Sequence, residues 1–141
     1  MTYAEDLKPA PASWLDIAFV SFLRLLAICF IGFTVQYWMR VSGYYAGFEG
    51  GQEWRFDTMS SSWKIVAAML SVLLPIAAVG LWSTLSWGRV VWAMAIITEL
   101  TMYSWFPERF GTNSSIVWFH LATIAIYLIF QACFIYSTKK A

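Results

Sequence analysis

The chain has 141 residues, of which 60% are hydrophobic and 12% charged, and its mean hydropathy is +0.64. A soluble domain is about a quarter charged and just under half apolar, and a small soluble fold has too little interior to cover so many apolar side chains. The formal net charge of +1 excludes the strongly basic surface by which proteins bind nucleic acid. Composition therefore predicts one membrane-embedded domain over residues 1–141, with the lipid bilayer as its main partner.

Four apolar runs have the length needed to cross a membrane. They extend over about 16–39, 63–82, 90–106 and 115–136, and the third is the shortest. Each is close to the roughly 20 residues that span about 30 Å of hydrocarbon. Because lipid offers the backbone no hydrogen-bond partners, each run should be an α-helix. The sequence thus predicts an all-α fold, an integral membrane four-helix bundle.

The segments outside these runs are polar or short. Residues 1–15 carry Glu5 and Asp6 instead of the basic leader of a signal peptide, so we expect the first helix to stay in the mature protein. The connection 41–62 is rich in glycine and aromatic residues, and it is expected outside the membrane as a structural cover or a partner-contacting surface. The other two connections are short enough to make their helices antiparallel neighbours.

Four crossings place both chain ends on one side of the membrane. Basic residues divide equally between the two sides, so they do not decide the orientation by number. The adjacent Lys139 and Lys140, and the acidic residues of the opposite loops, favour cytoplasmic termini.

Three polar residues fall near the middle of the predicted bundle. At about 1.5 Å of rise per residue, Arg24, Glu99 and Tyr127 reach a similar depth on three different helices. A charge at that depth costs at least about 2.5–3.5 kcal/mol, so such residues face the interior and pair. We predict an Arg24–Glu99 ion pair supported by the Tyr127 hydroxyl.

Helical spacing extends this polar centre. On the fourth helix His120, Thr123, Tyr127 and Gln131 share one face. A similar inward stripe is expected on the first helix, at Ser21, Arg24, Ala27, Ile31 and Thr34. The candidate intramembrane polar centre consists of Arg24, Glu99, Tyr127, His120 and Gln131.

This centre has two interpretations. In the structural one, the ion pair fixes the register of the helices. In the functional one, Glu99 binds a proton, a cation or a polar head group, and Arg24 tunes its pKa.

The sequence offers little for catalysis or cofactors. His120 is the one histidine, whereas a bis-histidine haem needs two. Cys29 and Cys133 lie on different predicted helices at unequal depths, which argues against a shared zinc site or a disulfide. Neither a phosphate-binding loop nor a nucleophile elbow occurs. We expect no catalytic residues, no cofactor and no metal.

Three fragments carry a resemblance: VAAMLSVLLPIAAVGLWS, SWGRVVWAMAIITELTMYSWFPERFG and WFHLATIAIYL. From about Trp14 to Tyr136 the chain resembles a family of uncharacterised small four-helix inner-membrane proteins of alphaproteobacteria, classed as a domain of unknown function. The resemblance implies a bacterial inner-membrane location and brings no activity with it. The LR motif of the first run is more distantly similar to DoxX-like membrane proteins, but QYWMRVSGYY replaces their glycine-and-lysine ending.

Two classes of function follow. The first is a non-catalytic accessory or assembly subunit that contacts other membrane proteins, or a second copy of itself, through its helices or its aromatic loop. The alternative is a membrane protein that handles a small ligand, a quinone or an ion or proton at a midplane Arg24–Glu99 site.

Overall fold

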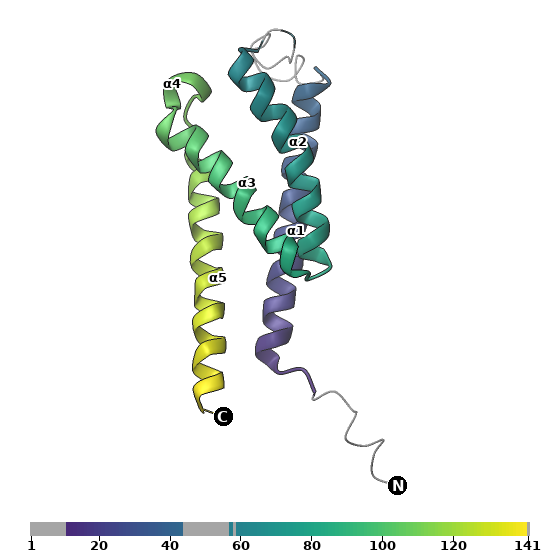
Figure 1. Ribbon diagram of the computed structural model, residues 1–141, viewed down its shortest axis with the longest axis vertical. Helices are drawn as coiled ribbons and strands as arrows, with labels where there is room; N and C mark the ends of the chain where they lie inside the picture. Colours follow the sequence, from purple (N-terminus) through teal and green to yellow (C-terminus); the bar gives the residue numbers. More distant parts are fainter. Residues whose placement is uncertain (1–10, 44–56, 58, 141) are drawn as a thin grey trace.

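The computed structural model describes residues 11–43, 57 and 59–140. Within these residues the fold is all-helical, with 87% helix and no strand. The elements in chain order are α1 (Trp14–Val41), α2 (Ser61–Trp82), α3 (Ser86–Trp105), α4 (Pro107–Phe110) and α5 (Ser114–Lys140), shown in Figure 1. The predicted all-α class is confirmed.

The predicted number of helices is wrong, because five are present in the described part of the chain. The additional one is α4, a single turn in the connection between the third and fourth predicted helices. Pro107 occupies its first turn, where a missing backbone N–H costs nothing. Gly111 ends it with a φ of 75°, which glycine adopts without strain.

The helix bounds differ from the predicted ones by a few residues. α1 begins at Trp14 because Ser13 and Asp16 form a capping box: Ser13 Oγ accepts from the Asp16 amide at 3.2 Å, and the Asp16 carboxylate accepts from the Ser13 amide at 3.0 Å. The predicted polar segment 1–15 therefore ends inside a helix. Residues 1–10, and 44–56 and 58 of the predicted loop, lie outside the described residues.

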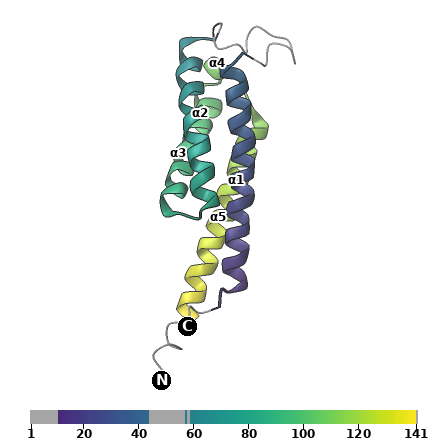
Figure 2. The same cartoon turned by 90° about the vertical axis from the view of Figure 1, so that its right-hand side faces the viewer.

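The helices alternate in direction, and the start of α1 and the end of α5 lie at the same end of the molecule (Figure 1). α2 packs along α1 and forms a hairpin with α3, and α5 returns along α3 and, to a smaller extent, α1. This hairpin is shorter than α1 and α5, which both continue beyond its turn (Figure 2). Three of the described helices, α1, α2 and α5, are long and apolar enough to cross a membrane.

The core lies mainly between α1, α2 and α3. The small residues Ala67, Ser71 and Ala78 of α2 are buried and allow close helix packing. A close approach joins Gly80 of α2 to Gly88 of α3, where a Cβ on either residue would overlap the backbone of the other. Both positions of this tight hairpin therefore require glycine.

The predicted inward stripe of α1 is wrong for most of its members. Ala27 is buried, but Ser21, Arg24 and Ile31 are exposed. The Ser21 hydroxyl donates to the carbonyl of Ile17 at 2.8 Å, so it needs no partner inside the bundle. The buried face of α1 consists of Leu23, Leu26, Ala27, Phe30 and Tyr37.

Candidate functional site

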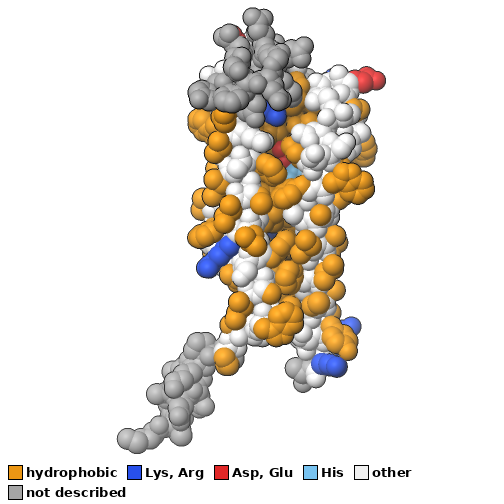
Figure 3. Space-filling view, turned by 180° about the vertical axis from the view of Figure 1, so that it is seen from behind, with side chains coloured by type: hydrophobic (Ala, Val, Ile, Leu, Met, Phe, Trp, Pro, Cys, Tyr) orange, Lys and Arg blue, Asp and Glu red, His pale blue; other side chains and the backbone are white. Residues whose placement is uncertain are grey.

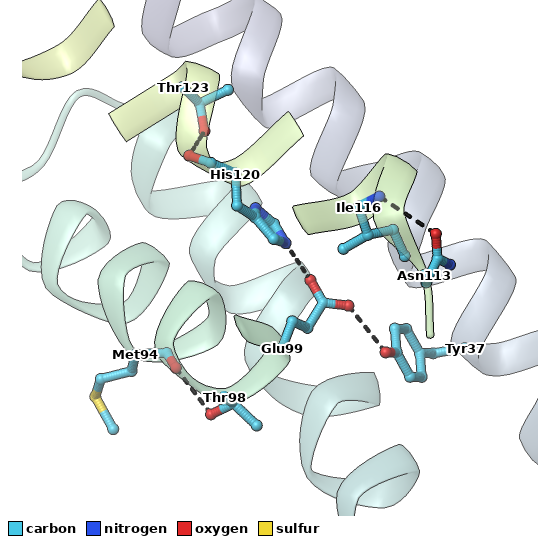
Figure 4. A network of polar contacts seen from close by, with 8 residues as sticks. All are labelled: Tyr37, Met94, Thr98, Glu99, Asn113, Ile116, His120 and Thr123. Atoms are coloured by element: carbon cyan, nitrogen blue, oxygen red, sulfur yellow. Dashed lines mark hydrogen bonds and ion pairs between the residues drawn. The ribbon is translucent and has the colours of Figure 1, made fainter. Parts of the chain in front are cut away.

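A buried carboxylate forms the polar centre of the bundle. Glu99 of α3 is 1% exposed, and each of its two oxygens has one partner. The Tyr37 hydroxyl of α1 donates to Oε1 at 2.9 Å, and Nε2 of His120 on α5 lies 2.6 Å from Oε2 (Figure 4). These three residues, which we call the Glu99 cluster, join three helices through one side chain.

Each member of the cluster lies on the buried face of its helix. Tyr37 follows Leu23 and Phe30 at steps of seven residues, two turns of α-helix, so the three share one side of α1. Glu99 belongs to the buried face of α3. His120 is one of two buried residues of α5, where the other is Thr123. Apolar packing on these faces thus brings the polar tips together.

The imidazole of His120 is enclosed by aromatic rings. The ring centroids of Phe30, Phe33 and Phe119 lie 5.6–6.2 Å from that of His120. Thr123 Oγ1 donates to the His120 carbonyl at 3.0 Å. Nδ1 of His120 is buried and has no hydrogen-bond partner among the described residues. The ring is therefore held by one polar contact, to Glu99, and by apolar packing.

A positive charge lies at one edge of the cluster. The Arg40 guanidinium carbon is 5.2 Å from the centroid of the Tyr37 ring and 5.7 Å from that of Trp63. Cations favour the faces of aromatic rings, and Tyr37 in turn donates to Glu99. The cluster thus combines a carboxylate, an imidazole and a phenol. Such a set can share and hold protons in a sealed, apolar setting.

The predicted Arg24–Glu99 ion pair is wrong. The Arg24 side chain is exposed, and its guanidinium carbon lies 5.5 Å from the Trp82 ring centroid. Trp82 is the last residue of α2, so Arg24 lies near the turn of the α2–α3 hairpin rather than beside Glu99. The helical rise per residue placed Arg24 at the depth of Glu99. That depth is wrong because α1 extends beyond the α2–α3 turn, and Arg24 also points away from the buried face of α1.

The other predicted members lie elsewhere along α5. The Tyr127 ring packs on Trp92 and Phe19, with centroids 5.3 and 6.0 Å apart, and Tyr127 has no hydrogen bond within the described residues. Gln131 is half-buried one turn further on. The structure thus brings together Glu99 and His120, but not Arg24, Tyr127 or Gln131. Tyr37 was not identified from the sequence, although the seven-residue steps from Leu23 to Phe30 and from Phe30 to Tyr37 place all three on one face of the helix.

The comparison with known families concerns nearly the whole chain. Residues 17–138 match the family described as "Family of unknown function (DUF6163)". The chain belongs to this family. All three residues of the Glu99 cluster fall within the matched range of this DUF6163 protein. No curated protein and no solved structure matches the chain.

The two cysteines of the DUF6163 protein, Cys29 and Cys133, are exposed free thiols. Within residues 11–43, 57 and 59–140, no three His, Cys, Asp or Glu side chains are grouped as metal ligands.

Proposed function

We propose that this DUF6163 protein is a non-catalytic accessory or assembly subunit of a membrane complex, located in the bacterial inner membrane with both termini in the cytoplasm. The observation that carries the proposal is the exposure of α5. In its most apolar stretch 11% of the residues are buried, compared with 44% in α2. A 27-residue helix that is apolar on nearly all sides needs lipid or other helices around it.

The proposal has all four long helices crossing the bilayer. α3 has 20 residues, which give about 30 Å of helix, and it is joined to the apolar α2 by a tight turn. Exposed tryptophans stand near helix ends, as at Trp82, Trp105 and Trp118, where their amphipathic rings suit the headgroup region. Hydrophobic side chains are spread along the whole length of the described part of the face drawn in Figure 3, with few charged side chains among them. These features support an antiparallel bundle within lipid.

In this proposal the Glu99 cluster has a structural role. Its three side chains are 0–2% exposed, so a soluble substrate has no direct access to them. A buried carboxylate satisfied by two partners fixes the relative rotation of α1, α3 and α5 more strictly than apolar contacts do. The exposed surface of α5 then remains available to a partner.

Membrane extraction and site-specific crosslinking test the two parts of the proposal. Alkaline carbonate should leave the full-length chain in the membrane pellet, and its release would contradict a multi-pass protein. A photoreactive residue at Ile129 of α5, 62% exposed, should crosslink one defined membrane protein in cells. The same residue at Ile65 of α2, 68% exposed, serves as the matched control. Equal labelling of many proteins from both positions would contradict a docking role for α5.

Proton handling is the second candidate, and it is favoured by the unpartnered Nδ1 of His120. Nε2 of His120 and Oε2 of Glu99 lie 2.6 Å apart, and which of the two side chains donates the hydrogen bond depends on the tautomer of His120. Infrared difference spectra between acidic and alkaline pH should then contain a carboxyl C=O band that Glu99→Gln removes. The structural role alone predicts no such pH-dependent band.

A further inference from the structure

Arg24 is a cation in an apolar stretch of α1 without a carboxylate partner in the described part of the chain. Its guanidinium carbon lies over the face of the Trp82 ring, 5.5 Å from the ring centroid. The guanidinium remains charged at every physiological pH and carries five N–H donors arranged to match phosphate oxygens. In a bilayer the nearest abundant groups of that kind are lipid phosphates.

A groove of about 310 Å³ runs along the outer surface between α1 and α2. Its walls are almost entirely apolar, and Trp82 and Ser83 line it where α2 ends. Pro75 cannot donate a backbone hydrogen bond and lies in the wall of the groove at mid-helix. Side chains that line the groove include Ile31, Val35, Pro75, Val79, Trp82 and Ser83.

Arg24 is connected to the groove through the shared face of α1 and through Trp82. Arg24, Ile31 and Val35 are separated by seven and four residues, so they share one face of α1. Trp82 lines the groove, and its ring makes a cation–π contact with the Arg24 guanidinium. Ser83, the residue that follows α2, also lines the groove. An apolar groove therefore ends at Trp82, whose ring contacts the Arg24 guanidinium.

We propose that this groove binds one anionic phospholipid. Its phosphate lies against Arg24 and Ser83, and an acyl chain lies along the groove past Val79 and Pro75. The inference rests on the membrane location proposed above. A lipid whose phosphate has no attached cation should bind a lone arginine more strongly than phosphatidylcholine does. The choline of phosphatidylcholine would bring a second positive charge near the guanidinium.

Native mass spectrometry of the full-length protein in mild detergent tests the site. The probes are phosphatidylglycerol and phosphatidylcholine with identical acyl chains, at equal concentrations. The wild type should bind more phosphatidylglycerol. Arg24→Gln should lower the ratio of the two bound lipids about fivefold, the factor by which one basic residue strengthens binding to anionic lipid. Arg24→Lys should keep part of the preference.

Two further variants distinguish a specific lipid site from a general electrostatic attraction between anionic lipids and the protein. Arg89→Gln removes a cation from the first turn of α3 that does not line the groove, and it should leave the ratio unchanged. Val79→Trp should fill the groove from its exposed side and reduce binding of both lipids. An unchanged ratio in Arg24→Gln, or an equal loss in Arg89→Gln, would overturn the lipid site. Either result leaves the membrane location standing if carbonate still fails to extract the chain, whereas extraction would overturn that location separately.

Discussion

The two ends of the bundle hold α5 by different means. At the end near α4, the Glu99 cluster ties α5 to α1 and α3, and both buried residues of α5 lie there. At the end near the termini, α1 and α5 continue beyond the α2–α3 turn and meet through phenylalanine rings. Phe19 and Phe134 have centroids 5.4 Å apart, and Phe22 and Phe130 are 5.6 Å apart. Directional hydrogen bonds thus fix α5 at one end, and packing of aromatic rings holds it at the other.

The largest expected effect is at the polar end. His120→Ala leaves the Glu99 carboxylate buried without its closest partner and should lower the free energy of unfolding by about 3–5 kcal/mol. Equilibrium unfolding in mixed micelles measures the change. Trp118→Ala, at a residue of the same helix that is 70% exposed, is the control and should change it by less than about 0.5 kcal/mol. A loss in His120→Ala no larger than in the control would remove the contrast between the ends.

The second-largest loss of stability is expected at the contact between Gly80 and Gly88. Gly88→Ala forces a methyl group into the backbone of Gly80 and should cost about 3 kcal/mol, because neither helix can yield locally. Gly32→Ala places the same methyl group where no atom lies within 4 Å, and it should be neutral or stabilising by up to about 1 kcal/mol. Similar unfolding midpoints for the two variants in mixed micelles would contradict the close approach of α2 and α3.

Tyr37→Phe tests the other bond of the Glu99 cluster. It removes the donor to Oε1 while preserving the ring, and it should destabilise the protein by about 2 kcal/mol. Tyr136→Phe, at a tyrosine 63% exposed, should change stability little. Thermal unfolding of both in the same detergent gives the comparison, and equal melting temperatures would mean that the hydroxyl contributes nothing.

The smallest effect is expected at the aromatic end. Phe130→Leu loses the ring contacts to Phe19 and Phe22 but keeps an apolar side chain, so it should cost about 1 kcal/mol. The same unfolding assay applies. A loss as large as that in His120→Ala would mean that both ends hold α5 equally firmly.

The sequence predicts the positions of the helices better than it predicts the contacts between them. Run length located all four long helices, because membrane-length apolar stretches have few alternatives. It missed the capping box at Ser13 and the single turn at Pro107, which depend on local hydrogen bonds and on one proline.

The contacts of Glu99 were predicted only in part. Depth alone cannot give the rotation of a helix, and one residue of α-helix turns about 100°. Arg24 lies one residue beyond Leu23, which is 1% exposed, and this single step places it on the outer surface. His120 was correctly placed on an inward face. Its partnership with Glu99, and that of Tyr37, required the actual packing of three helices.

A double-mutant cycle between Glu99 and His120 measures directly whether these two side chains hold α3 and α5 together. The free energy of unfolding is measured in mixed micelles for the wild type, Glu99→Ala, His120→Ala and the double variant. If the two side chains stabilise each other across α3 and α5, the double variant should lose about 2–3 kcal/mol less than the sum of the single variants. Losses that add to within about 0.5 kcal/mol would mean that Glu99 and His120 do not stabilise each other.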